Sequence, residues 1–161
     1  MKKLVKSLLR KETSEAYLFD ADVFLSYLRN DNLFPYSNRV IQKALDGDIS
    51  VYVSSILYDD IATALLSKGV VIDEIVAVIA GLSAIPHIPL PITPEIAISA
   101  LLLYKRFRGP RKLHYFDSFH ISTSLYYKYP LITSDKFIIG NKDKLGIDVI
   151  DLRSFKTDDD T

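Results

Sequence analysis

The sequence predicts an α/β protein built on a parallel sheet that helices cover on both faces. Short apolar runs of strand type alternate along the chain with longer segments in which apolar residues recur at helical spacing. Such repeated strand–helix alternation is typical of a parallel sheet between two layers of helices. The chain has 161 residues, which suits one domain, and its formal net charge of zero gives no global attraction to nucleic acid or membrane.

The first strand and helix enclose a turn that carries two acids. The apolar run at 17–19 predicts a buried strand, which ends at Asp20, and Asp22 follows two residues later. Apolar residues then recur at helical spacing and predict a helix over 23–28. A second helix is expected over 36–45, where an Asp-Gly-Asp sequence ends it.

The middle of the chain repeats this pattern. Residues 49–53 are rich in β-branched and aromatic side chains, which predicts the second strand, and two serines connect it to a helix over 56–67. Gly69 ends that helix, and a further helix is expected over 71–82. A brief third strand is expected over 87–90.

The last third of the chain contains the clearest helix start. The Thr-Pro-Glu sequence at 93–95 supplies a cap, a proline at the first helical position and an acid in the first turn, which predicts a helix to about residue 106. A loop then leads to a helix over 116–127. Strands are expected at 131–133 and 149–150.

Acidic residues are expected to gather at one edge of this sheet. In a parallel sheet, each helix that follows a strand begins near the carboxyl ends of the strands, where open α/β sheets bind ligands. Asp20 and Asp135 directly follow strands, Asp60 lies in the first turn after the second strand, and Asp117 opens the helix before the fourth. Each acid alone can be a helix cap, worth roughly 0.3–1 kcal/mol. Together they predict a common acidic crevice.

Clustered carboxylates require a neutralising partner. Carboxylates within about 4–6 Å repel one another, and one must protonate unless a cation is present. The chain has no cysteine and three histidines, so a set of mainly oxygen ligands favours Mg²⁺ or Mn²⁺ over zinc. Such ions can polarise a phosphodiester and generate an attacking hydroxide.

Four stretches carry a resemblance to a known family. In chain order they are FDADVFLSYL, VSSILYDDIATAL, YFDSFHISTSL and PLITSDKF, and they resemble the four acidic motifs of PIN-domain ribonucleases, in particular the VapC-like toxins of toxin–antitoxin pairs. The resemblance covers about residues 17–152. It implies a three-layer α/β/α fold around a central parallel sheet, and Mg²⁺- or Mn²⁺-dependent endonucleolytic cleavage of RNA.

The resemblance also implies roles for individual residues. Carried over by position, the metal-binding and catalytic acids are Asp20, Asp60, Asp117 and Asp135. Thr133 matches the hydroxyl residue that family members often place two positions before the last acid.

Some positions depart from the family pattern or leave their roles open. Asp60 replaces the usual Glu with a side chain one methylene shorter, and Asp59 beside it is an alternative, although adjacent helical residues point about 100° apart. Asp22 stands where the family often has Asn or Ser. His120 lies one helical turn after Asp117 and is either a further site residue or a buried hydrogen-bonded group.

A basic segment precedes the third acid. Five cations fall within eight residues, with aromatic residues between them: Lys105, Arg106, Arg108, Arg111 and Lys112. Clustered charge binds phosphates and exposed aromatic side chains stack on single-stranded bases, which predicts an RNA-binding segment. The alternative is a solvated helix end whose cations complement the helix dipole.

The leading functional prediction is a metal-dependent endoribonuclease, the toxin of a toxin–antitoxin pair. For such a protein the resemblance implies a homodimer and a small antitoxin. A haloacid-dehalogenase-type phosphatase is a second hypothesis, because FDADV offers two acids at a strand end, although Phe24 and the absence of a following glycine depart from that family. A non-catalytic PIN-like module that binds RNA or protein is a third.

The two ends of the chain are expected to lie outside the domain. Residues 1–16 predict a short basic helix and no signal peptide, because charged residues interrupt the apolar stretch. The nuclease domain is expected over 17–155, followed by an acidic tail over 156–161. The longest apolar region, 75–92, contains a histidine and three prolines, so we predict no membrane span and a cytoplasmic protein.

Overall fold

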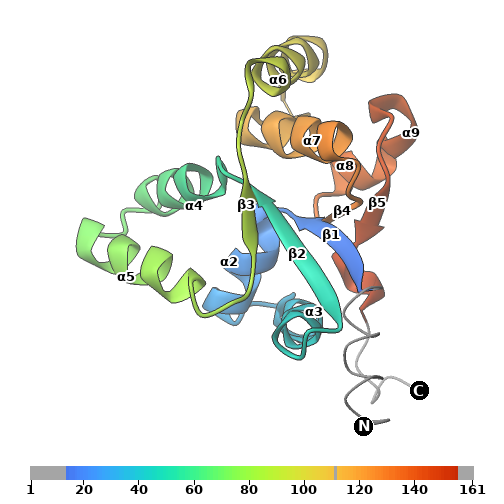
Figure 1. Ribbon diagram of the computed structural model, residues 1–161. Helices are drawn as coiled ribbons and strands as arrows, with labels where there is room; N and C mark the ends of the chain where they lie inside the picture. The colour runs from blue at the N-terminus through green and yellow to red at the C-terminus, as the bar shows by residue number, and fades with distance from the viewer. Residues whose placement is uncertain (1–13, 111, 156–161) are drawn as a thin grey trace, which may run out of the picture.

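A parallel sheet forms the centre of the protein. A computed structural model describes residues 14–110 and 112–155, which form a five-stranded sheet with the order β3-β2-β1-β4-β5 and only parallel pairs (Figure 1). The strands are β1 (Glu15–Phe19), β2 (Ile49–Ser54), β3 (Ile88–Leu90), β4 (Leu131–Thr133) and β5 (Val149–Asp151). The predicted central parallel sheet is therefore confirmed.

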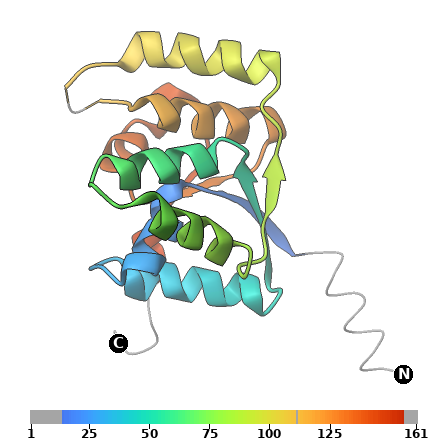
Figure 2. The same cartoon turned by 90° about the vertical axis from the view of Figure 1, so that its left-hand side faces the viewer.

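Helices pack on both faces of the sheet (Figures 1 and 2). One face carries α2 (Ala21–Arg29), α3 (Phe34–Leu45), α4 (Leu57–Leu66) and α5 (Ile72–Leu82). The other carries α6 (Pro94–Phe107) and α7 (Tyr115–Tyr127), and the short α8 (Lys136–Gly140) and α9 (Lys142–Leu145) connect β4 to β5. The single turn η1 (Leu152–Ser154) follows β5. The three-layer α/β/α architecture is confirmed.

Side chains of the central strands point alternately to the two faces of the sheet, so the described core has two parts. Leu18 of β1 pairs with Leu131 of β4, and Phe19 pairs with Ile132. Leu18 and Leu131 pack in the core beneath α7, whereas Phe19 and Ile132 pack in the core beneath α2 to α5. Because successive strand residues point to opposite faces, a strand buried on both sides needs apolar residues at consecutive positions, as at Leu18-Phe19 and Leu131-Ile132.

α7 is the most enclosed helix of the structure described. It lies between the sheet and α6, with α6 outermost (Figure 2). Residues 118–124 are consequently buried, and most of them are small or hydroxylated. The Ser122 hydroxyl donates to that of Ser99 on α6 over 3.2 Å, and the Thr123 hydroxyl donates to the Phe119 carbonyl over 2.7 Å. This close packing fixes the rotation of α7, and with it the direction of Asp117 and His120.

The first strand begins earlier in the chain than the sequence predicted. β1 begins at Glu15, two residues earlier than expected, because Glu15 and Ala16 pair with Ile49 and Ser50 of β2. Residues 15 and 16 therefore belong to the sheet and not to the extension. The rest of the extension, 1–13, and the tail, 156–161, lie outside the described residues.

None of the helices within 14–110 and 112–155 combines the length and apolar character needed to cross a membrane.

Candidate functional site

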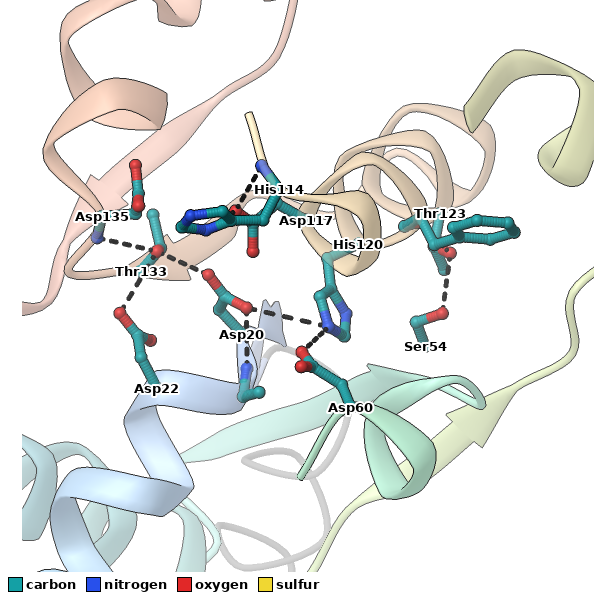
Figure 3. Close-up of polar contacts among 12 residues, drawn as sticks. Asp20, Asp22, Ser54, Asp60, His114, Asp117, His120, Thr123, Thr133 and Asp135 are labelled. Carbon is teal, nitrogen blue, oxygen red and sulfur yellow. Dashed lines mark hydrogen bonds and ion pairs between the residues drawn. The ribbon is translucent and has the colours of Figure 1, made fainter. Parts of the chain in front are cut away.

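An acidic cleft of about 460 Å³ opens at the carboxyl edge of the sheet. The turn after β1, the first turns of α4 and α7 and the turn after β4 all contribute to it (Figure 3). Five carboxylates line it, together with two cations and a histidine: Asp20, Asp22, Asp60, Asp117, Asp135, Lys136, Arg153 and His114. The four acids predicted from sequence thus face one space.

Asp20 is the most enclosed of these acids, with 3% of its surface exposed. It caps α2, since its Oδ1 accepts from the Ala21 amide over 2.7 Å. Its Oδ2 accepts from the Thr133 hydroxyl over 2.6 Å, and that hydroxyl in turn accepts from the Asp135 amide over 3.1 Å. Thr133 therefore fixes the first acid relative to the turn that carries the fourth.

Asp60 and His120 form a pair between α4 and α7. The Asp60 Oδ2 lies 3.0 Å from the His120 Nε2, and the Asp20 Oδ1 lies 3.8 Å from the same nitrogen (Figure 3). The His120 side chain is fully buried. Of the two adjacent acids on α4, Asp60 lines the cleft whereas Asp59 is exposed to solvent.

Asp117 and Asp135 form the outer part of the site. The Asp117 Oδ2 accepts from the His114 amide over 3.3 Å and lies 3.2 Å from the His114 Nδ1. Asp135 caps α8, where its Oδ1 accepts from the Ile138 amide over 2.9 Å. A carboxylate can therefore cap a helix and still bind a cation, because it has two oxygens and the backbone amide occupies only one lone pair.

Asp22 is held against the turn after β4. Its Oδ2 accepts from the Ser134 amide over 2.6 Å and from the Ser134 hydroxyl. Its Oδ1 is buried and has no hydrogen-bond partner among the described residues. A buried acceptor without a partner is uncommon and costs free energy, which points to a missing donor or cation.

Burial and crowding raise the pKa values of these acids. Burial raises the pKa of Asp20 to about 6; His120 and the Thr133 hydroxyl oppose the shift, and the neighbouring carboxylates add to it. Burial and the charge of Asp20 raise the pKa of Asp22 to about 7. Burial is also the main reason that the pKa of Asp117 is raised. When all of these carboxylates are ionised, they therefore repel one another.

The buried histidine responds to the same charges. Burial lowers the pKa of His120, but its hydrogen bond with Asp60 and the charges of Asp20 and Asp117 outweigh burial and raise that pKa overall. The carboxylates thus favour a positive charge at the position of this buried ring, beside Asp20 and Asp60.

The residues present fit a divalent cation. Ligand atoms of Asp20, Asp60 and His120 lie within 4.8 Å of one another, and those of His114, Asp117 and Asp135 form a second such group. Oxygen-rich sets with an occasional imidazole suit Mg²⁺, Mn²⁺ and related ions. The unpartnered Asp22 oxygen and the raised pKa values indicate the same unmet need for positive charge.

The predicted basic segment does not line this cleft in its described residues. Lys105 and Arg106 end α6 and are exposed, as are Arg108 and Lys112 in the following loop; Arg111 lies outside the described residues. The Phe107 ring packs in the core near Phe137, with centroids 6.2 Å apart, because its position on α6 faces the sheet. It is therefore not available to stack on bases.

The structure adds two cations that the sequence did not single out. Lys136 lines the cleft directly after Asp135, a position that the fourth motif could have suggested. Arg153 reaches it from η1, where its Nη1 donates to the Ser134 carbonyl over 3.0 Å and lies 3.1 Å from the Asp151 Oδ1. No local sequence signal identifies Arg153, because its approach depends on the place of β5 beside β4.

Comparison with solved structures shows where this fold occurs. A chain of a toxin–antitoxin complex from Klebsiella pneumoniae is 16% identical, with a TM-score of 0.55 over 83% of this chain and 95% of that one. A chain of VapBC2 from Rickettsia felis, bound to a promoter DNA fragment, is 12% identical, with a TM-score of 0.61 over 84% and 98%. A chain of VapBC-5 from Mycobacterium tuberculosis is 14% identical, with a TM-score of 0.52 over 84% and 98%.

Sequence comparison gives the family. A search of curated protein sequences finds no match. The family model of the PIN domain matches residues 17–139, which contain the turn after β1, the first turns of α4 and α7 and the turn after β4. The chain therefore belongs to the PIN domain family, a family of nucleases.

Proposed function

We propose that the protein is a metal-dependent endoribonuclease that hydrolyses RNA phosphodiester bonds. The observation that carries this proposal is the cleft in which four sequence-distant acids from four separate segments meet. Burial of that many carboxylates is costly unless a cation binds among them. Membership of the PIN domain family supports the same chemistry.

The proposed roles follow from the contacts in the cleft. Asp20, Asp60, Asp117 and Asp135 hold Mg²⁺ or Mn²⁺, which when bound supplies Lewis-acid polarisation of the phosphodiester and a water of lowered pKa. Thr133 positions the Asp20 carboxylate through its 2.6 Å hydrogen bond.

Cations near the cleft complete the proposed substrate site. Lys136 and Arg153 line the cleft and can attract the RNA backbone. The exposed basic residues at the end of α6 and in the loop before His114 add positive charge outside the cleft, where they can contact more of the RNA backbone.

The biological setting is also part of the proposal. We infer a toxin that acts on cytoplasmic RNA, assembles as a homodimer and is inhibited by a small antitoxin. The similar solved structures are toxin–antitoxin complexes, which supports this setting. A segment that covers the cleft and places a cation or donor among the carboxylates would be an effective inhibitor.

The test is cleavage of a defined RNA with Mg²⁺ or Mn²⁺. Asp20→Asn and Asp117→Asn are each expected to lower the cleavage rate by at least about 100-fold while circular dichroism stays unchanged, because each removes a proposed ligand charge. Asp59→Asn is the matched control, since Asp59 is exposed beside the cleft residue Asp60.

Full cleavage by both cleft variants would overturn the assignment. RNA binding without cleavage at any concentration of either ion would identify a non-catalytic module instead. An aspartyl-phosphate trapped at Asp20 would favour the phosphatase hypothesis.

A further inference from the structure

His120 is oriented toward the carboxylates of the cleft by every polar contact that the described residues give it. Its Nε2 lies 3.0 Å from Asp60 and 3.8 Å from Asp20, while its Nδ1 is buried without a hydrogen-bond partner among those residues. The ring comes from α7 and faces Asp60 on α4 and Asp20 at the end of β1 (Figure 3).

His87 shows how a histidine with two hydrogen-bond partners is held in the same protein. Its Nδ1 lies 2.7 Å from the Ile85 carbonyl and its Nε2 lies 2.8 Å from the Tyr58 hydroxyl, so both ring nitrogens have partners. His120 lacks this second anchor within the described chain. Its place is set instead by the packing of α7 and by the two acids.

The three donor atoms lie close enough together for one ion to reach all of them. With bonds of about 2.1 Å, adjacent ligands of an octahedral ion lie about 3.0 Å apart and opposite ligands about 4.2 Å apart. The His120 nitrogen is 3.0 and 3.8 Å from the two oxygens, and all three donors lie within 4.8 Å of one another. The first separation equals that of adjacent ligands and the second lies between the two values, so the side chains must shift to form an octahedral set.

We propose that His120 is a direct metal ligand through its Nε2, together with Asp20 and Asp60, and that this nitrogen makes the centre prefer Mn²⁺ and other first-row transition ions over Mg²⁺. The inference rests on the metal dependence in the proposed function. Mg²⁺ prefers oxygen ligands, whereas imidazole nitrogen binds transition ions well. A mixed nitrogen–oxygen set therefore shifts selectivity away from Mg²⁺.

Electron spin echo envelope modulation of bound Mn²⁺ tests this ligand directly and needs no RNA. We expect tag-free protein with one equivalent of Mn²⁺ to show ¹⁴N modulation from a coordinated imidazole. The pattern should change to that of ¹⁵N when only the histidines carry ¹⁵N. Because labelling alters no contact, this result does not depend on the folding of any variant, and absence of nitrogen modulation overturns the proposal.

Two matched substitutions assign the nitrogen. His120→Asn should abolish the modulation, whereas His114→Asn, at the exposed rim beside Asp117, should retain it. If His120→Asn does not fold, His120→Gln and the His114 variant serve the same comparison. Modulation that persists without His120, or that disappears without His114, contradicts the assignment.

Calorimetric titrations with each ion test the selectivity. Mn²⁺ should bind at least about tenfold more tightly than Mg²⁺, because even changes to residues that only contact a metal ligand alter metal affinity by about 10–100-fold. His120→Asn should bring the ratio of the two affinities close to one, because it removes the nitrogen ligand. Equal affinities in the unmodified protein would contradict the claim. Nitrogen ligation without RNA cleavage would refute the proposed function and leave this inference intact, and cleavage without nitrogen ligation would do the reverse.

Discussion

Single residues in this cleft serve two purposes at once. Asp20 caps α2 and accepts from Thr133, and Asp135 caps α8, yet both line the acidic cleft. A cap alone does not require burial, and burial is what makes these residues costly when no cation is present. Asp22 illustrates this most clearly, because one of its oxygens is saturated by Ser134 and the other is unpartnered within the described chain.

We predict that Asp22→Asn stabilises the metal-free protein at pH 8. The folded pKa of Asp22 is raised to about 7, so the folded state binds more protons than the unfolded state between about pH 4 and pH 7, and stability falls as pH rises through that window. The asparagine keeps an acceptor for Ser134 and removes the charge. Urea unfolding with EDTA should show a gain on the order of 2 kcal/mol at pH 8.

The same comparison at low pH provides the control. The gain should shrink as pH falls from about 7 toward 4 and vanish below about pH 3, where Asp22 is neutral in both states. A variant that is less stable than the parent protein at pH 8, or a gain that does not depend on pH, would contradict the burial of an uncompensated charge.

The acids of the site and Thr133 could be predicted from the sequence, but the contacts of His120 and Arg153 could not. Asp20, Asp60 and Asp117 could be assigned to one edge because each lies beside the end of a strand or the start of a helix. Helical spacing indicated that His120 shares a face with Asp117 but could not give its contact with Asp60, which depends on how α4 and α7 pack. Arg153 could not be predicted either, because its position at the cleft also depends on tertiary packing.

Long helices were more predictable from the sequence than short ones. Helices of nine or more residues, such as α6, show enough periodicity to be recognised, whereas α8 and α9 have five and four residues and were not predicted. The basic segment at the end of α6 was predicted to bind RNA near the third acid, yet its described residues face solvent outside the cleft. Whether a basic segment lies in the cleft depends on tertiary packing, which local sequence does not give.

Two glycines provide a matched test of the helix boundaries. Gly69 follows α4 with a φ of +77°, and Gly81 lies within α5; an added Cβ would meet no described heavy atom within 4 Å at either position. Gly69→Ala should therefore destabilise by about 1 kcal/mol through backbone strain alone. Gly81→Ala should stabilise by about 0.5–1 kcal/mol through helix propensity.

Thermal or urea unfolding of both variants checks this prediction, and metal binding should be unchanged because neither glycine lines the cleft. Effects of the same sign at both positions would contradict the helix boundaries described here.

The molecule as a whole leaves an apolar surface on its outermost helix. α6 packs on α7, and its outer face forms a groove of about 530 Å³ with Ile98 and Leu102 at 60% and 62% exposure. Glu95 and Arg106 line opposite ends of the same groove. A two-fold axis that pairs two copies of α6 in antiparallel orientation would bring each Glu95 close to the partner's Arg106.

We expect this face of α6 to form the contact of the proposed homodimer. Replacing Ile98 and Leu102 together with Glu should convert the dimer into a monomer in size-exclusion chromatography with light scattering, because four charges would enter an apolar contact. Val76→Glu on α5 is the control, since Val76 is 61% exposed and away from this groove. Loss of the dimer with the control, or a dimer that survives the double variant, would exclude the α6 contact.

We propose that acids distant in sequence gather in one cleft because a divalent ion binds among them. The anomalous diffraction signal of manganese, measured in crystals of the protein soaked in Mn²⁺, tests this proposal. We predict a peak inside the cleft, within coordination distance of Asp20 and Asp60. A cleft that stays free of manganese at saturating concentration, with ions bound only elsewhere on the surface, would contradict it.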